Sequence, residues 1–135
     1  MRAVLDTNVL ISALLTPAGA PARLLRSWRA GGYQLIVSAK LLDELERALA
    51  YPKLQARVSP RDAAQYVDLL RRGAELRADV GALPRVRSAD PNDDYLISLA
   101  ADARAAIVTG DRQLLLLSDV LPVYAPAKFL EMVGG

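Results

Sequence analysis

The chain has 135 residues, of which 53% are hydrophobic and 24% charged, and it contains neither cysteine nor histidine. This size and composition fit one globular domain over residues 1–135 and exclude a disordered chain or a disulfide scaffold. Because imidazole and thiolate groups are missing, any metal or acid–base chemistry has to be carried by carboxylates.

The charge pattern is compatible with a polyanionic partner. There are 17 basic residues, 14 of them arginine, against 15 acidic ones, so four acids gathered in one pocket would leave 17 positive charges facing 11 negative ones elsewhere. A basic exterior around an acidic pocket suits nucleic acid, although an arginine-rich surface that is simply solvated gives the same composition. No apolar run approaches the roughly 18 residues of a membrane helix, and strand-like sequence begins just after Met1. We therefore expect a cytoplasmic protein with no membrane contact.

Hydrophobic periodicity, capping residues and breakers predict alternating strands and helices. In chain order they are a strand at 2–5, helices at 9–15 and 22–30, a strand at 34–37, helices at 39–50 and 60–77, an irregular segment at 79–88, a helix at 91–103, a strand at 106–109, a helix at 113–117, a strand at 120–124 and a helix at 128–133. Short apolar strands separated by helices indicate an α/β fold, with a parallel sheet between two helical layers.

Two aspartates follow predicted strands. Asp6 comes directly after the first strand, and Asp111 follows "AIVTG". In parallel α/β folds, ligands bind beyond the carboxyl ends of the strands, so both lie where a site is expected. Helix capping is the alternative role for each, and Thr7 and Asn8 leave Asp6 less needed as a cap. Asn8 and Thr109 add short polar groups at this edge, either to support a carboxylate or to bond within turns.

The stretch "DPNDDYLISLAADA" supplies a third acid. With Leu96 and Ala100 on the buried stripe of a helix, Asp93 lies on the apolar side and Asp94 projects from the opposite face. Asp93 is therefore the inward carboxylate, unless it completes a capping box with Asp90.

The helix after Ser38 offers a fourth acid, but its identity stays open on periodicity alone. Glu44 and Glu46 flank the apolar stripe on opposite sides, and the pattern does not choose between them. Carboxylates that converge on one edge would repel one another without a cation. Oxygen ligands without histidine or cysteine favour Mg²⁺ or Mn²⁺, which serve phosphodiester chemistry.

Three stretches together resemble the PIN-domain ribonucleases of the VapC-like group, which are toxins of bacterial and archaeal toxin–antitoxin pairs. "VLDTNVLISALL" is similar to the opening motif of that family, "SAKLLDELERAL" to the second, and "DPNDDYLISLAADARAAIVTGDRQLL" to the last two. The resemblance covers essentially the whole chain in the right order. It selects Glu44 over Glu46, and the spacing of 18 residues between Asp93 and Asp111 agrees with the helix-face argument for Asp93.

The resemblance implies a metal-dependent endoribonuclease that acts on RNA with Mg²⁺ or Mn²⁺. The implied metal ligands and catalytic residues are Asp6, Glu44, Asp93 and Asp111, with Asp94 as an alternative to Asp93. Asn8 and Thr109 would support these ligands, and Arg112, beside Asp111, is the candidate phosphate contact. The family also implies a homodimer held inactive by a cognate antitoxin.

Two other functions fit part of the pattern. A PIN-like module that binds RNA or a partner without cutting would look alike in sequence, although four clustered acids without a metal would be costly. A phospho-receiver domain shares the length and an acidic Mg²⁺ pocket, but it would need paired acids after the first strand, where only Asp6 stands. A haloacid-dehalogenase-like phosphatase would need aspartate at position 8, which is Asn8 here.

Overall fold

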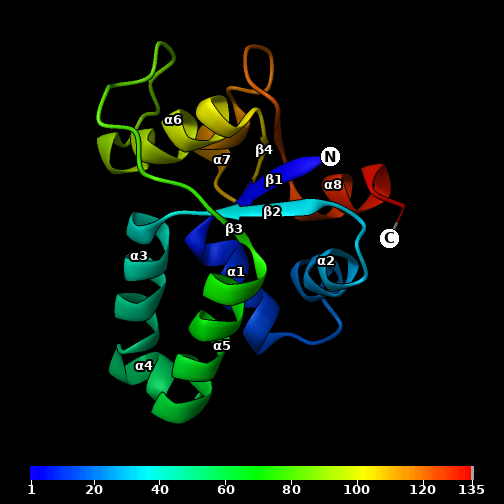
Figure 1. The fold of residues 1–135 in the computed structure, drawn as a ribbon, viewed down its shortest axis with the longest axis vertical. Coiled ribbons are helices and arrows are strands. Elements are labelled where there is room, and N and C mark those ends of the chain that lie inside the picture. The colour runs from blue at the N-terminus through cyan, green and yellow to red at the C-terminus, as the bar shows by residue number, and fades with distance from the viewer. Residues whose placement is uncertain (135) are drawn as a thin grey trace.

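Five parallel strands form the sheet at the centre of the computed structural model, which describes residues 1–134. The strand order is β3–β2–β1–β4–β5 (Figure 1). The strands are β1 (Arg2–Leu5), β2 (Gln34–Val37), β3 (Glu75–Leu76), β4 (Ala106–Val108) and β5 (Val123–Tyr124). This order differs from the 2-1-3-4-5 order of receiver domains, which argues against the phospho-receiver alternative.

Helices cover both faces of this sheet. They are α1 (Thr7–Leu15), α2 (Ala20–Arg29), α3 (Ala39–Leu49), α4 (Pro52–Gln55), α5 (Pro60–Gly73), the 3₁₀ turn η1 (Pro91–Asp93), α6 (Asp94–Ala103), α7 (Arg112–Leu115) and α8 (Pro126–Met132). Helix α6 packs on β1 and β4 from one side, whereas α1, α2, α3 and α5 lie on the other (Figure 1). Consecutive residues of β1 and β4 are buried because both faces are covered, which confirms the predicted α/β class.

The main differences from the predicted elements lie between residues 50 and 77. The helix predicted to reach residue 77 ends at Gly73, and the chain then forms β3 as a two-residue edge strand beside β2. The single-turn helix α4 is also absent from the prediction. A two-residue strand is too short to show the alternating pattern on which sequence prediction depends.

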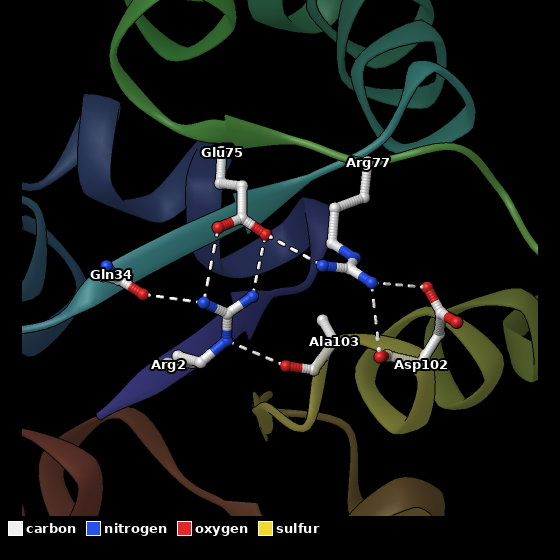
Figure 2. Close-up of polar contacts among 6 residues, drawn as sticks. All are labelled: Arg2, Gln34, Glu75, Arg77, Asp102 and Ala103. Carbon is white, nitrogen blue, oxygen red and sulfur yellow. Dashed lines mark hydrogen bonds and ion pairs between the residues drawn. The ribbon is translucent and has the colours of Figure 1, made fainter.

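A chain of alternating charges connects β3 to its neighbours (Figure 2). Glu75 accepts from Nη2 of Arg2 at 2.7 Å and from Nη1 of Arg77 at 3.1 Å. Arg77 also reaches Asp102 near the end of α6, at 2.9 Å from Nη2 to Oδ2. Arg2 donates from Nε to the carbonyl of Ala103 at 2.8 Å. These contacts tie β1, β3 and α6 together.

Over residues 1–134, no single helix has both the length and the apolar composition needed to cross a membrane. Helices α1 and α2 meet both criteria only when taken together, and they are bent by 94° relative to one another.

Candidate active site

Polar side chains from distant parts of the sequence line a pocket of about 310 Å³. Its lining consists of Asp6, Thr7, Asn8, Glu44, Asp90, Asp93, Leu96 and Asp111, and we call it the acidic pocket. Five of these eight residues carry carboxylates and none is basic. The pocket lies where β1 and β4 end, and at this point the chain leaves the sheet in opposite directions. Such a switch point is where open α/β sheets bind ligands.

Asp6 is both a helix cap and a pocket residue. Its Oδ1 accepts from the backbone N–H of Val9 at 2.9 Å, which makes it the N-cap of α1, and its Oδ2 accepts from the hydroxyl of Thr109. The expectation that Thr7 or Asn8 would replace it as the cap is therefore wrong. Burial raises the pKa of Asp6, and the charge of Asp111 adds to this effect, whereas the hydrogen bonds from Thr109 and Val9 oppose it.

Asp111 holds a similar position after β4. Its Oδ1 accepts from the N–H of Gln113 at 2.9 Å and caps α7, and its own N–H donates to the hydroxyl of Thr109 at 3.0 Å. Thr109 thus contacts Asp6 through its hydroxyl and fixes the backbone of Asp111 with the same group. Thr109 therefore contacts a carboxylate and bonds within the turn after β4, the two roles left open for it by the sequence.

Asp93 enters the acidic pocket at the start of α6. It is the N-cap residue of that helix, but its side chain makes no capping hydrogen bond there. The Asp90 carboxylate accepts from the N–H of Asn92, and the N–H of Asp93 donates to the Asp90 carbonyl instead, so the reciprocal pair of a capping box is not formed. Burial, followed by the charges of Asp90, Asp111, Asp6 and Glu44, raises the pKa of Asp93 to about 6. Four neighbouring carboxylates therefore act on Asp93, and no basic side chain lines the pocket to offset them.

Asp94 lies outside the acidic pocket. Its carboxylate accepts from Nε of Arg87 at 2.6 Å and from the N–H of Ser88 at 2.8 Å, and the residue is 3% exposed. The bond from Ser88 and the guanidinium of Arg87 lower the pKa of Asp94. Asp94 thus anchors the segment before η1, and the structure brings Asp93, not Asp94, to the other acids.

Glu44 reaches the acidic pocket from α3. Its Oε2 accepts from the hydroxyl of Thr7 at 3.1 Å and from the hydroxyl of Tyr95 at 2.7 Å. Glu46 instead pairs with Arg71 of α5 at 3.0 Å, well exposed to solvent. The structure therefore separates the two glutamates that periodicity left equivalent.

The remaining predicted residues lie at the margin. Asn8 is exposed on the pocket wall, and Arg112 is exposed at the first position of α7 without lining the pocket. Sequence reasoning missed Thr7 and Tyr95 as contacts of Glu44, and it treated Asp90 only as a cap. Asp90 does cap η1 through Asn92, and its position three residues before Asp93 was the available signal that it also faces the acidic pocket.

The donor set of the acidic pocket fits a hard divalent cation. Clustered carboxylates without a basic neighbour are what Mg²⁺ or Mn²⁺ would bind and neutralise. In the conformation described for residues 1–134, however, no three acidic side chains are close enough to hold an ion together. Binding would require some of these carboxylates to turn inward, and the side chain of Asp93 is not held by a capping hydrogen bond.

Comparison with known proteins identifies similar chains. A family model described as "PIN domain" matches residues 2–113. The uncharacterized protein MJ1680 of Methanocaldococcus jannaschii is 26% identical, and the match covers 97% of this chain and 90% of that protein.

Two solved structures share the fold. PAE2754 from Pyrobaculum aerophilum has a TM-score of 0.68 at 17% identity, over 99% of this chain and 90% of the other. VapBC2 from Rickettsia felis, solved with a DNA fragment from its promoter, has a TM-score of 0.61 at 15% identity, over 91% and 97% of the two chains.

Proposed function

This chain belongs to the PIN-domain family, and we propose that it is a metal-dependent endoribonuclease that hydrolyses RNA phosphodiester bonds at the acidic pocket. PIN domains are generally nucleases. The observation that carries the proposal for this chain is the convergence of Asp6, Glu44, Asp93 and Asp111 on one pocket that has no basic residue in its lining. Such a pocket repels a phosphate unless a cation neutralises it.

The four acids are the proposed ligands of Mg²⁺ or Mn²⁺. A bound ion of this kind activates water for attack and neutralises charge that develops on the phosphate. Asp6 is pre-oriented for this role by Val9 and Thr109, and Glu44 by the hydroxyl groups on its Oε2. Arg112 is placed beside Asp111 at the surface, and we assign it contact with the RNA backbone.

The proposed biological role is the toxin of a toxin–antitoxin pair that acts on cytoplasmic RNA. Similarity to the VapBC2 structure supports this role and a cognate antitoxin as the partner. A second copy of the chain is proposed as a further partner on the family resemblance.

A non-catalytic module that binds RNA or a protein partner is the second candidate. The observation that favours it is the spacing of the acids, since no three of them within residues 1–134 form a ready-made ion site. This alternative predicts RNA binding without cleavage in any metal.

The deciding experiment is cleavage of a mixed RNA pool by the wild type, with Mg²⁺, Mn²⁺ or EDTA in parallel. We expect cleavage with either metal and none with EDTA. Asp6→Asn keeps a capping side chain but removes a ligand charge, so cleavage should fall by at least about 100-fold. Asp43→Asn, an exposed acid on α3 outside the pocket, is the matched control and should cut at the wild-type rate. Wild-type protein that binds RNA but cuts it with neither metal would favour the non-catalytic module.

A further inference from the structure

We propose that Tyr95 is a positioning residue for Glu44, which it holds in the orientation needed to bind a divalent cation. This inference rests on the proposed function, in which Glu44 is a metal ligand. The hydroxyl of Tyr95 donates to Oε2 of Glu44 at 2.7 Å, and the hydroxyl of Thr7 donates to the same oxygen at 3.1 Å. Both contacts use Oε2 and neither uses Oε1, so one carboxylate oxygen is fixed and the other is left for a ligand.

Glu44 needs such a restraint because of its surroundings. The acidic pocket also contains Asp6, Asp90, Asp93 and Asp111, whose charges repel its carboxylate. Glu44 is only half-buried, and a glutamate has several side-chain rotamers that lead toward solvent. The hydrogen bonds from Tyr95 and Thr7 oppose rotation of the Glu44 carboxylate toward solvent, and the one from Tyr95 is the shorter.

Tyr95 is itself held rigidly. The residue is 8% exposed, and its ring lies under the ammonium group of Lys40, 4.6 Å from the ring centroid. Lys40 precedes Glu44 by four residues, one turn along α3, so Tyr95 contacts α3 at two successive turns.

The contact also sets the relation between two of the proposed ligands. Tyr95 follows Asp93 by two residues at the start of α6, and Glu44 lies on α3. A hydrogen bond between Tyr95 and Glu44 therefore fixes the start of α6 against α3, and with it the positions from which Asp93 and Glu44 face the acidic pocket. Positioning groups behind metal ligands typically change affinity or activity by about 10–100-fold when removed.

The test is Mn²⁺ binding to Tyr95→Phe, measured by calorimetry on the full chain. Tyr66→Phe is the matched control, because Tyr66 is also 8% exposed and its hydroxyl donates to the carbonyl of Leu10 at 2.6 Å, outside the acidic pocket. Both variants lose one buried hydroxyl, and circular dichroism with thermal unfolding verifies that both fold. Only Tyr95→Phe should weaken Mn²⁺ binding, by about 10-fold.

A double-mutant cycle with Glu44→Gln isolates the pairwise effect. If the hydroxyl acts through Glu44, Tyr95→Phe should weaken Mn²⁺ binding in the wild type and add nothing in the Glu44→Gln background. In RNA cleavage, Tyr95→Phe should need about 10-fold more Mn²⁺ for half-maximal rate and recover the wild-type rate at saturation.

The outcomes separate this inference from the proposed function. Equal Mn²⁺ affinity of Tyr95→Phe and Tyr66→Phe would overturn the positioning role and leave the nuclease proposal intact. If Tyr95→Phe binds Mn²⁺ more weakly but the wild type cuts no RNA, the positioning role is supported and the nuclease proposal is rejected. A wild type that binds no Mn²⁺ would overturn both.

Discussion

Asp6 resolves an apparent choice between capping and function because its two carboxylate oxygens have different partners. Oδ1 caps α1 and Oδ2 contacts Thr109 in the acidic pocket. An N-cap residue that directly follows a parallel strand lies at the carboxyl edge of the sheet, so the capping position and the site position coincide there. Asp111 repeats the arrangement after β4. Helix capping therefore positions these acids and is no evidence against a functional role.

The two glutamates of α3 offer a matched test at the residue scale. Glu44→Gln should reduce metal-dependent RNA cleavage by at least about 100-fold, because it removes a proposed ligand charge. Glu46→Gln removes the same charge from the same helix but affects only the exposed pair with Arg71, and surface pairs of this kind contribute little to stability. Rates measured at equal protein and Mg²⁺ concentration decide the matter. Similar loss in both variants would mean that charge on α3, and not the acidic pocket, controls cleavage.

How much of the site could be predicted from the sequence depends on how local the signal is. Asp6 follows a strand directly, Asp111 comes three residues after the end of β4, and helix periodicity places Asp93, so short-range patterns were sufficient. Glu44 required the family resemblance, because an apolar stripe has two equivalent flanks. The hydroxyl contacts of Thr7 and Tyr95 with Glu44 join residues that are 37 and 51 positions apart, and no periodicity encodes such pairs.

At the scale of elements, β3 depends on charge more than on apolar packing. It has two residues, Glu75 partly and Leu76 mostly exposed, and Glu75 bridges Arg2 and Arg77 (Figure 2). Sequence prediction continued α5 past Gly73 because the strand has only two paired residues, too few for a distinct strand pattern. The long-range ion pairs that favour an edge strand here are not visible in a local pattern. The longer strands β1, β2 and β4 showed buried apolar runs and were predicted within a residue.

The pH dependence of β3 follows from Glu75. Its hydrogen bonds and ion pairs with Arg2 and then Arg77 lower the pKa of the folded state below the ordinary value of a glutamate. A lowered folded-state pKa contributes stability above the unfolded-state pKa, and this contribution is lost as the pH falls through the folded-state value. Glu75→Gln should therefore unfold at a lower temperature than the wild type at pH 7, and the difference should shrink on acidification below pH ~4.

Thermal unfolding followed between pH 3 and pH 7 measures this difference. Glu131→Gln, at an exposed acid whose ion pair with Lys128 spans 3.7 Å, is the control and should show little difference from the wild type at any pH. A constant gap between Glu75→Gln and the wild type across the whole range would show that Glu75 contributes through shape and not through its charge.

At the scale of the whole molecule, strand order determines where the site forms. The sequence predicted a parallel sheet but not its order, because strand pairing is set by long-range packing that local patterns do not record. With β1 and β4 adjacent, the residues that follow them meet at the switch point, and α3 and α6 each extend one acid toward it. The carboxylates that meet here have no basic partner in the lining of the acidic pocket. Their mutual repulsion therefore lowers the stability of the folded state.

This cost predicts how metal and mutation change stability. If Mg²⁺ or Mn²⁺ binds the folded state alone, a concentration of 100 times Kd should stabilise the wild type by about 2.7 kcal/mol. Asp6→Asn should differ from the wild type both without metal and with it. Burial and the charge of Asp111 raise the pKa of Asp6, so the ionised side chain destabilises the metal-free fold at neutral pH. The variant should therefore unfold at a higher temperature than the wild type in EDTA. It should then gain less from added metal, because a ligand charge is gone. Thermal unfolding of both proteins in EDTA and in Mg²⁺ at matched ionic strength tests the two effects together. An equal rise in both proteins would indicate a general ionic effect and argue against a cation site built on Asp6.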